Sequence, residues 1–113
     1  MCNKIGTYLK ALAAKANNVP FFAAVPSSTI DWAISDGFSE IPIEDRDGIE
    51  VTHVTGADLN NQPTTVRLTP EGSQAANPAF DITPRDYVSG IITERGVCEA
   101  SETALLDMYP ENI

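Results

Sequence analysis

The feature that most constrains the fold is an apolar run from Val19 to Val25, interrupted only by Pro20 near its beginning. A run of this length that is rich in Phe and Val is typical of a strand buried on both faces, and such strands occur in parallel sheets covered by helices. A second short apolar run, residues 91–93, has the same character. The two runs predict the central strands of one sheet, at residues 19–25 and 88–93.

An amphipathic helix is predicted just before the first run. Between Lys4 and Asn17 the apolar residues recur every three or four positions, which places them along one side of a helix; they are Ile5, Tyr8, Leu9, Leu12, Ala13 and Ala16. Lys10 and Lys15 fall on the other side. The helix is expected to end at residues 17–18, because Asn tolerates the left-handed backbone of a helix exit and Pro20 prevents continuation.

The beginning of this helix is the first candidate binding site. Asn3 is a favourable N-cap residue, since its side chain can accept a hydrogen bond from a free first-turn N–H, and Lys4 adds a cation beside the remaining donors. A helix amino end of this kind suits an anion such as a phosphate. We therefore predict that Asn3 and Lys4 contact a phosphate.

The segment from Pro26 to Asp31 follows the carboxyl end of the first predicted strand, which is where ligands bind in open α/β sheets. Its hydroxyls, on residues 27–29, either contact a ligand or cap a short helix at residues 32–35, and capping is the favoured interpretation. Asp36 and Gly37 are predicted to end that helix.

An antiparallel hairpin is predicted in the middle of the chain. Residues 48–55 and 64–69 alternate β-branched and polar residues and are joined by an eight-residue loop. His53 has no cysteine, serine or second histidine nearby in the sequence, which favours a structural role over that of a general base. The preceding acidic cluster (Glu40, Glu44, Asp45 and Asp47) lacks the spacing of a calcium loop and is interpreted as a solvated face.

Two prolines bracket the segment 77–84. Asn77 and Thr83 each precede a proline, which disfavours helical backbone, so the segment is expected to be a stiff arm that positions Asn77 and Asp81. Thr83 is predicted to cap a short helix at residues 85–89. Ser101 is predicted to cap a last helix at residues 102–108.

Together these elements predict an α/β fold. Its sheet is expected to be partial, Rossmann-like and mostly parallel, flanked by helices, with the hairpin as an antiparallel insertion. A chain of 113 residues suits a single domain over residues 1–113. The two cysteines, Cys2 and Cys98, lie far apart without a metal-ligand motif, so free thiols and no metal site are expected.

Composition restricts the partners. The net charge of −9 disfavours nucleic acid and anionic membranes as bulk partners, since both would repel the chain. No window approaches 18 consecutive apolar residues, and the beginning of the chain lacks the pattern of a secretory signal. A cytoplasmic location is expected.

Six motifs together resemble one enzyme family. In chain order they are NKIGTY (3–8), PSSTID (26–31), EIPIEDR (40–46), VTHVTG (51–56), NPAFDITP (77–84) and GIITERGV (90–97). They resemble the carboxyl-terminal third of the methylthioribose-1-phosphate isomerases. Ribose-1,5-bisphosphate isomerase and the regulatory subunits of the translation initiation exchange factor are more distant relatives with the same architecture.

The resemblance implies conversion of 5-methylthioribose 1-phosphate to 5-methylthioribulose 1-phosphate in methionine salvage, without cofactor or metal. The catalytic aspartate and cysteine of the family lie on segments that would precede residue 1, and neither Cys2 nor Cys98 matches the cysteine motif. No catalytic residue is therefore assigned, and the chain alone is expected to be inactive. Asn3 and Lys4 match the family's substrate-contacting pair.

The resemblance also implies a homodimer, because the family dimerises through its carboxyl-terminal domain. Sheet edges and apolar faces left without neighbours would favour self-association as well. The alternative function is a non-catalytic interaction or regulatory module related to the translation initiation exchange factor subunits.

Overall fold

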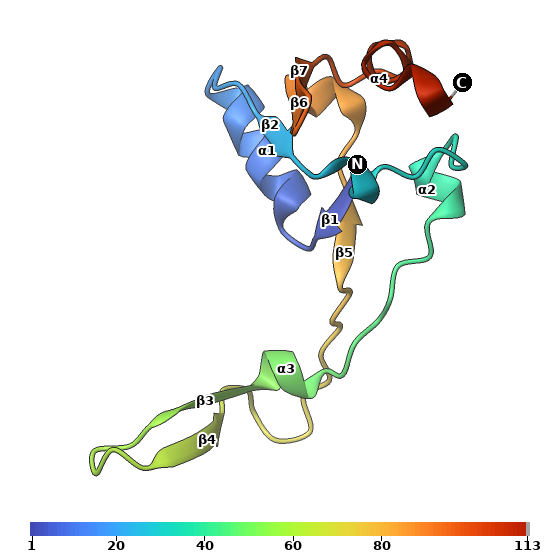
Figure 1. Ribbon diagram of the computed structural model, residues 1–113. Helices are drawn as coiled ribbons and strands as arrows, with labels where there is room; N and C mark the ends of the chain where they lie inside the picture. The colour runs from blue at the N-terminus through green and yellow to red at the C-terminus, as the bar shows by residue number, and fades with distance from the viewer. Residues whose placement is uncertain (113) are drawn as a thin grey trace. The chain divides into compact units, whose positions relative to one another are not determined.

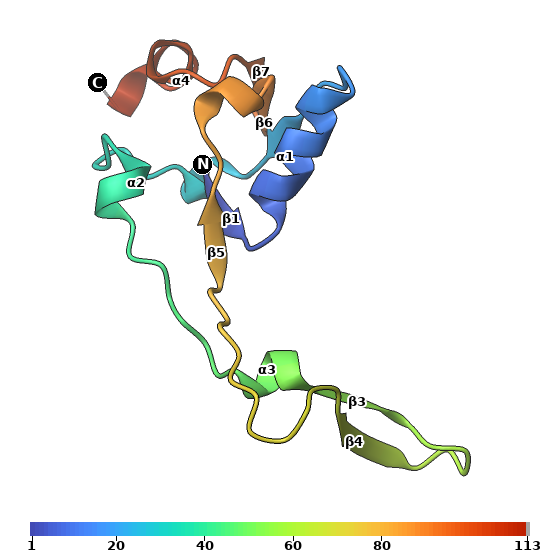
Figure 2. The same ribbon diagram turned by 180° about the vertical axis from the view of Figure 1, so that it is seen from behind.

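The computed structural model describes residues 1–112, which divide into two compact units. Unit 1 comprises Met1–Pro42 and the chain from Phe80 onward, and unit 2 comprises Ile43–Ala79. Figures 1 and 2 show the elements of each unit from opposite sides.

Unit 1 contains two small sheets. In the first, β1 (Cys2–Lys4) pairs with β5 (Phe80–Ile82) in antiparallel orientation. In the second, β2 (Phe22–Ala24) pairs in parallel with β6 (Gly90–Thr93), and β6 pairs antiparallel with β7 (Gly96–Cys98). The strand order is β2-β6-β7, so the two apolar runs form parallel strands of one sheet, as predicted. Both were expected to be central, but within residues 1–112 only β6 is, and β2 lies at the edge of the sheet.

The α/β class is confirmed, but a mostly parallel sheet is not found in the described residues. Of the strand pairings among residues 1–112, β2 with β6 is parallel, and the other three are antiparallel. One reason is the turn at residues 94–95, where Gly96 with φ 131° lets the chain reverse and add β7 beside β6. The other is that the first residues form a strand instead of the start of a helix.

The helices of unit 1 are α1 (Thr7–Ala16), α2 (Gly37–Glu40) and α4 (Glu102–Met108), with 3₁₀ turns η1 (Ser27–Thr29), η2 (Arg85–Tyr87) and η3 (Pro110–Asn112). The predicted last helix is confirmed with its cap, since Ser101 Oγ accepts a hydrogen bond from the N–H of Ala104 at 3.2 Å. The exit of α1 is confirmed too: Asn18 adopts φ 56°, and the N–H of Val19 donates to the carbonyl of Ala14 at 2.9 Å.

Three local predictions in unit 1 were wrong. Asp36 begins a helix instead of ending one, because its carboxylate accepts the N–H of Phe38 and caps α2. The predicted helix at 85–89 is only the turn η2, and Thr83 does not cap it. The hydroxyls at residues 27–29 do not cap a helix at 32–35 either; the segment is η1 and makes no side-chain cap.

Unit 2 consists of α3 (Ile49–Thr52) and a hairpin of β3 (His53–Ala57) with β4 (Pro63–Arg67), which confirms the predicted antiparallel insertion. The predicted first strand, residues 48–55, was wrong over its first half, because residues 49–52 form a helical turn in which the N–H of Thr52 donates to the carbonyl of Gly48 at 3.0 Å. The connection, residues 58–62, is shorter than predicted, and Asp58 closes it by accepting the N–H groups of Asn60 and Gln62. Asn77 is buried, and its amide donates to the carbonyl of Asp47 at 2.9 Å.

The apolar core of unit 1 is small. Among its described residues, the buried apolar ones are Ala11, Ala23 and Tyr109. Gly90 allows close packing, because a Cβ there would lie 2.9 Å from the carbonyl oxygen of Cys98 and 3.0 Å from the ring of Phe22. With so little buried apolar surface, polar contacts contribute a large share of what fixes the fold.

The orientation of α1 differs from what its amphipathic pattern indicates. Thr7 and Ala11 are buried, whereas Leu9 is 70% exposed and Leu12 is 36% exposed. At 100° per residue these two pairs lie on opposite sides of the helix. The apolar face predicted from the sequence is therefore the face that the described chain leaves uncovered.

Candidate functional site

Asn3 and Lys4 lie on strand β1, where Asn3 is opposite Asp81 and Lys4 is opposite Phe80 of β5. Both are exposed. Within residues 1–112, neither side chain has a hydrogen-bond or ion-pair partner. The pair is thus held by its backbone, and both polar ends are available to a ligand.

The N-cap role predicted for Asn3 was wrong. Helix α1 begins at Thr7, three residues after the predicted start at Lys4, and follows Gly6 with φ 101°, a backbone conformation that favours glycine. The group that satisfies the helix amino end is the Asp81 carboxylate, which accepts the N–H of Gly6 at 2.8 Å and the N–H of Tyr8 at 3.1 Å. The anion at this helix end is therefore a carboxylate of the chain itself, and the contact of Asn3 and Lys4 with a phosphate stays a prediction.

This cap changes what a ligand can contact. The N–H groups of Gly6 and Tyr8 are occupied by Asp81, so these two donors are not available to a phosphate in this arrangement. A ligand at this place would meet the side chains of Asn3 and Lys4 instead. The Asp81 carboxylate ties β5 to the start of α1, and with the β1–β5 pairing it fixes the position of both residues.

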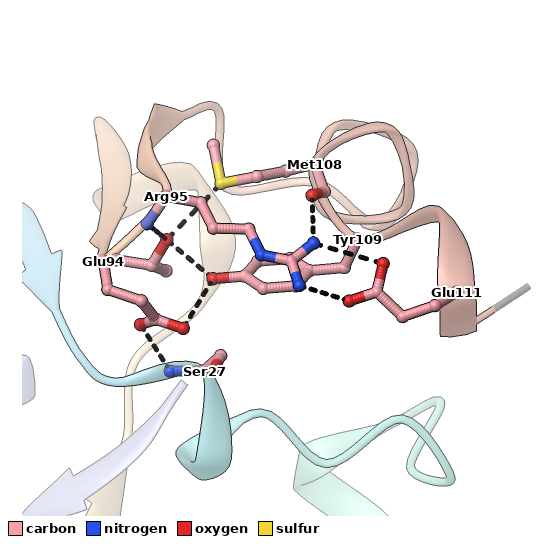
Figure 3. A network of polar contacts seen from close by, with 7 residues as sticks. Ser27, Glu94, Arg95, Met108, Tyr109 and Glu111 are labelled. Carbon is pink, nitrogen blue, oxygen red and sulfur yellow. Dashed lines mark hydrogen bonds and ion pairs between the residues drawn. The ribbon is translucent and has the colours of Figure 1, made fainter.

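A second polar cluster lies at the carboxyl ends of the parallel strands β2 and β6 (Figure 3). Glu94, in the turn after β6, accepts the N–H of Ser27, in the turn after β2, at 3.0 Å. The Ser27 side chain, followed by backbone hydrogen bonds from Glu94 and Ser27, lowers the pKa of Glu94 to about 2. The lowered pKa keeps the Glu94 carboxyl ionised at neutral pH. The group lies at the carboxyl ends of parallel strands, where open α/β sheets bind ligands.

Arg95 joins the same turn to the end of α4. Its guanidinium donates to the carbonyl of Met108 at 3.0 Å, pairs with both oxygens of Glu111, and lies 4.2 Å from the ring centre of Tyr109. The Tyr109 hydroxyl donates to Thr93 Oγ1 at 2.8 Å. Figure 3 shows that these side chains use their polar atoms on one another, which suits a fixed structural joint.

The sequence did not predict the cluster around Glu94 and Arg95. One signal was present, since both residues follow directly after a predicted buried parallel strand. Asp81 was expected to be held in place, and it is, but its hydrogen bonds to Gly6 and Tyr8 join residues more than 70 positions apart. No local pattern reports such a pairing.

Cys2 and Cys98 are free thiols, as predicted, and burial raises the pKa of the Cys98 thiol. His53 Nδ1 lies 2.8 Å from Thr52 Oγ1 at the start of the hairpin. In residues 1–112, no three His, Cys, Asp or Glu side chains converge as a metal site would require, and no helix is long and apolar enough to cross a membrane.

Comparison with known proteins identifies the family. The model of the initiation factor 2 subunit family matches residues 1–100. The chain belongs to this family. The match includes β1 with Asn3 and Lys4, the Asp81 cap and the turn at residues 94–95.

Several curated members are very similar to the chain. The methylthioribose-1-phosphate isomerase of Methylorubrum extorquens is 61% identical over 111 residues, which are 98% of this chain and 30% of that relative. The isomerase of the same name from Methylocella silvestris is 57% identical over all 113 residues. The chain thus spans about a third of the length of the curated relatives it matches.

Two solved structures resemble the chain to a similar degree. The 5-methylthioribose 1-phosphate isomerase of Pyrococcus horikoshii gives a TM-score of 0.79 at 38% identity, covering 97% of this chain and 28% of that protein. The delta subunit of translation initiation factor eIF-2B from A. fulgidus gives 0.78 at 32% identity, covering 97% and 29%. The fold is therefore shared by both branches of the family.

Proposed function

We propose that this chain is part of a methylthioribose-1-phosphate isomerase and that it presents Asn3 and Lys4 to the sugar phosphate. The observation that carries the proposal is the 61% identity to an isomerase of that name over 98% of the chain. The free side chains on β1 support it, because a lysine and an amide without partners suit the oxygens of a phosphate and a sugar. The proton-transferring groups would come from outside residues 1–113.

The proposal assigns Lys4 to binding and not to proton transfer. Substrate and product of this isomerisation carry the same phosphate, so a contact to it stabilises ground state and transition state alike. Removing such a contact raises KM with little change in kcat. A charged hydrogen bond contributes about 1.5–3 kcal/mol, which corresponds to about a 10- to 150-fold change in kcat/KM.

The test is a chimera in which this chain replaces the matched 111 residues of the Methylorubrum extorquens isomerase. We expect it to turn over 5-methylthioribose 1-phosphate, and Lys4→Ala to lower kcat/KM through KM. Lys10→Ala is the matched control, because Lys10 is an exposed lysine on α1 without a polar partner in the described residues. A folded but inactive chimera, or equal effects of the two substitutions, would contradict the proposal.

The second candidate function is a regulatory module related to the initiation factor subunits. The observation in its favour is the TM-score of 0.78 to the eIF-2B delta subunit, almost equal to that of the isomerase. Calorimetric titration separates the two functions. Binding of the sugar phosphate supports the isomerase, whereas binding of a GDP-loaded partner protein without sugar phosphate binding supports the regulatory module.

Other expectations belong to the same proposal. They are a role in methionine salvage, a Rossmann-like sheet once the rest of the protein is present, one domain over residues 1–113, a homodimer, a cytoplasmic location, and a reaction without cofactor or metal. Exposed apolar residues such as Leu9 and Phe22 support self-association. Light scattering of the chain at micromolar concentration tests the homodimer.

A further inference from the structure

The turn η1 follows the carboxyl end of β2 and carries two exposed hydroxyls, on Ser28 and Thr29. The sequence favoured a capping role for these hydroxyls, but η1 has no side-chain cap. The other interpretation was contact with a ligand, and a hydroxyl suits it because it both donates and accepts hydrogen bonds. The position of η1 relative to the candidate site therefore matters.

The path of the chain brings η1 to the end of unit 1 that holds Asn3 and Lys4. Helix α1 has 10 residues and is about 15 Å long, and residues 17–21 join it to β2. Figures 1 and 2 show β2 running back along α1 toward the beginning of β1. The turn after β2 thus lies at the same end of unit 1 as the candidate pair on β1.

Glu94 fixes η1 to the neighbouring strand. One carboxylate oxygen accepts the N–H of Ser27 at 3.0 Å, and the other lies 3.4 Å from the Tyr109 hydroxyl. The turn itself is closed by two backbone hydrogen bonds of 3.0 Å, which the carbonyls of Pro26 and Ser27 accept. The turn is thus a rigid unit that one carboxylate holds from outside (Figure 3).

The residues behind Glu94 are anchored as well. The Arg95 guanidinium donates to the carbonyl of Met108 and pairs with Glu111, and the Trp32 ring lies 5.7 Å from that of Tyr109. Trp32 follows η1 in the chain. The segment after β2 is therefore held at two points, by Glu94 and by Tyr109.

We infer that Glu94 is a positioning residue, which holds η1 beside the sugar phosphate at Asn3 and Lys4. The inference rests on the proposed function and adds a second contact surface to the same site. A role in proton transfer does not fit Glu94, because its two oxygens face Ser27 and Tyr109 and its low pKa keeps it ionised. Its effect on the substrate passes through η1.

Loss of the Glu94 carboxylate is expected to lower kcat more than it raises KM. Lys4 lies on β1 and keeps its contact with the phosphate, whereas the sugar loses a surface that orients it. A displacement of about 1 Å in a positioning group can lower the rate about 100-fold, so we expect Glu94→Ala to lower kcat by about tenfold or more. Lys4→Ala acts in the opposite way, mainly through KM.

The experiment uses the chimera with the Methylorubrum extorquens isomerase. Glu94→Gln keeps a side-chain oxygen that accepts the N–H of Ser27, so its kcat should stay within about threefold of the parent value. Ser101→Ala is the stability control: it removes the cap of α4 and should lower the melting temperature without changing kcat. If Glu94→Ala does not fold, Glu94→Asp, whose carboxylate is one methylene shorter, takes its place with the same expected loss.

A second measurement does not depend on turnover. The N–H groups of Thr29 and Ile30 close η1, and their amide exchange reports on the turn. We expect 5-methylthioribose 1-phosphate to slow this exchange in the parent chimera and in Glu94→Gln, but not in Glu94→Ala.

The outcomes separate this inference from the proposed function. An active chimera in which Glu94→Ala leaves kcat unchanged, or in which Glu94→Gln loses as much as Glu94→Ala, would overturn the positioning role and leave the isomerase assignment standing. An inactive chimera whose turn is protected by the sugar phosphate only when Glu94 or Gln is present would support the positioning role and reject the assignment. An inactive chimera without such protection would reject both.

Discussion

The two units of the chain are held together in different ways. In unit 1 the decisive hydrogen bonds join segments that are far apart: Gly6 to Asp81 across 75 positions, and Ser27 to Glu94 across 67. In unit 2 the hairpin pairs neighbouring segments, as in the contact of Thr55 with Thr65, 10 positions apart. Unit 1 thus depends on a few polar links between distant segments, whereas the hairpin of unit 2 depends on local pairing.

The largest difference in the free energy of unfolding is expected between alanine substitutions of two aspartates, one in each unit. Both aspartates accept backbone N–H groups. Asp81→Ala leaves the N–H groups of Gly6 and Tyr8 without their partner and should lower the free energy of unfolding by about 2–3 kcal/mol. Asp58→Ala affects only an exposed hairpin loop and should cost clearly less. Urea unfolding followed by circular dichroism measures both.

A further readout ties the first substitution to the candidate site. If Asp81 fixes β1, amide exchange of residues 2–4 should accelerate in Asp81→Ala and stay unchanged in Asp58→Ala. Equal costs for the two substitutions would show that the distant carboxylate is no more important than the loop carboxylate. The contrast between the units would then be wrong.

The same contrast explains what the sequence predicts well. The hairpin, the helix capped by Ser101 and the Asn18 exit depend on residues within a few positions, and all three are confirmed. The start of α1 was misplaced, because its cap comes from Asp81 in a segment that the sequence places 75 positions from Gly6. Asn3 had the right chemistry for a cap but pairs in a strand instead.

The candidate site shows the same contrast between local features, which the sequence predicts, and contacts between distant positions, which it does not. Its two residues were predicted because neighbouring positions carry the motif, and their free side chains agree with a contact role that stays a prediction. The cluster around Glu94 and Arg95 was missed, since it assembles from three turns and a helix end that only folding brings together. The apolar row of α1 was recognised, but a sequence alone does not show which side of a helix its own chain covers.

A smaller effect is expected from two of the buried threonines, one in each unit. Thr52 Oγ1 donates to the carbonyl of Gly48 at 3.1 Å, so Thr52→Val in unit 2 should cost about 1 kcal/mol. Thr83 in unit 1 is 0% exposed and its hydroxyl has no hydrogen-bond partner within residues 1–112, so Thr83→Val should be neutral or stabilising. Thermal unfolding compares them, and a larger loss for Thr83→Val would show that its hydroxyl has a partner in solution.

The smallest effect is expected from a change of pH, which acts on the Glu94 carboxylate in the polar cluster of Figure 3. Hydrogen bonds from the Ser27 side chain and from the backbone of Glu94 and Ser27 lower the pKa of Glu94 from 4.5 to about 2 in the folded chain. A carboxylate whose pKa is lower in the folded state contributes stability that is present above the unfolded pKa and is lost as pH falls toward the folded value. The free energy of unfolding should therefore fall between about pH 4.5 and 2, and less steeply in Glu94→Gln.

Trp32 provides the measurement, because its ring lies 5.7 Å from that of Tyr109, the residue whose hydroxyl contacts Glu94. Denaturant unfolding followed by Trp32 fluorescence at a series of pH values compares the parent chain with Glu94→Gln. Glu71→Gln is the control, an exposed glutamate of unit 2 without a hydrogen bond in the described residues. Parallel pH profiles for all three chains would mean that the link between the turns after β2 and β6 does not stabilise unit 1, and only the Asp81 cap would then distinguish the two units.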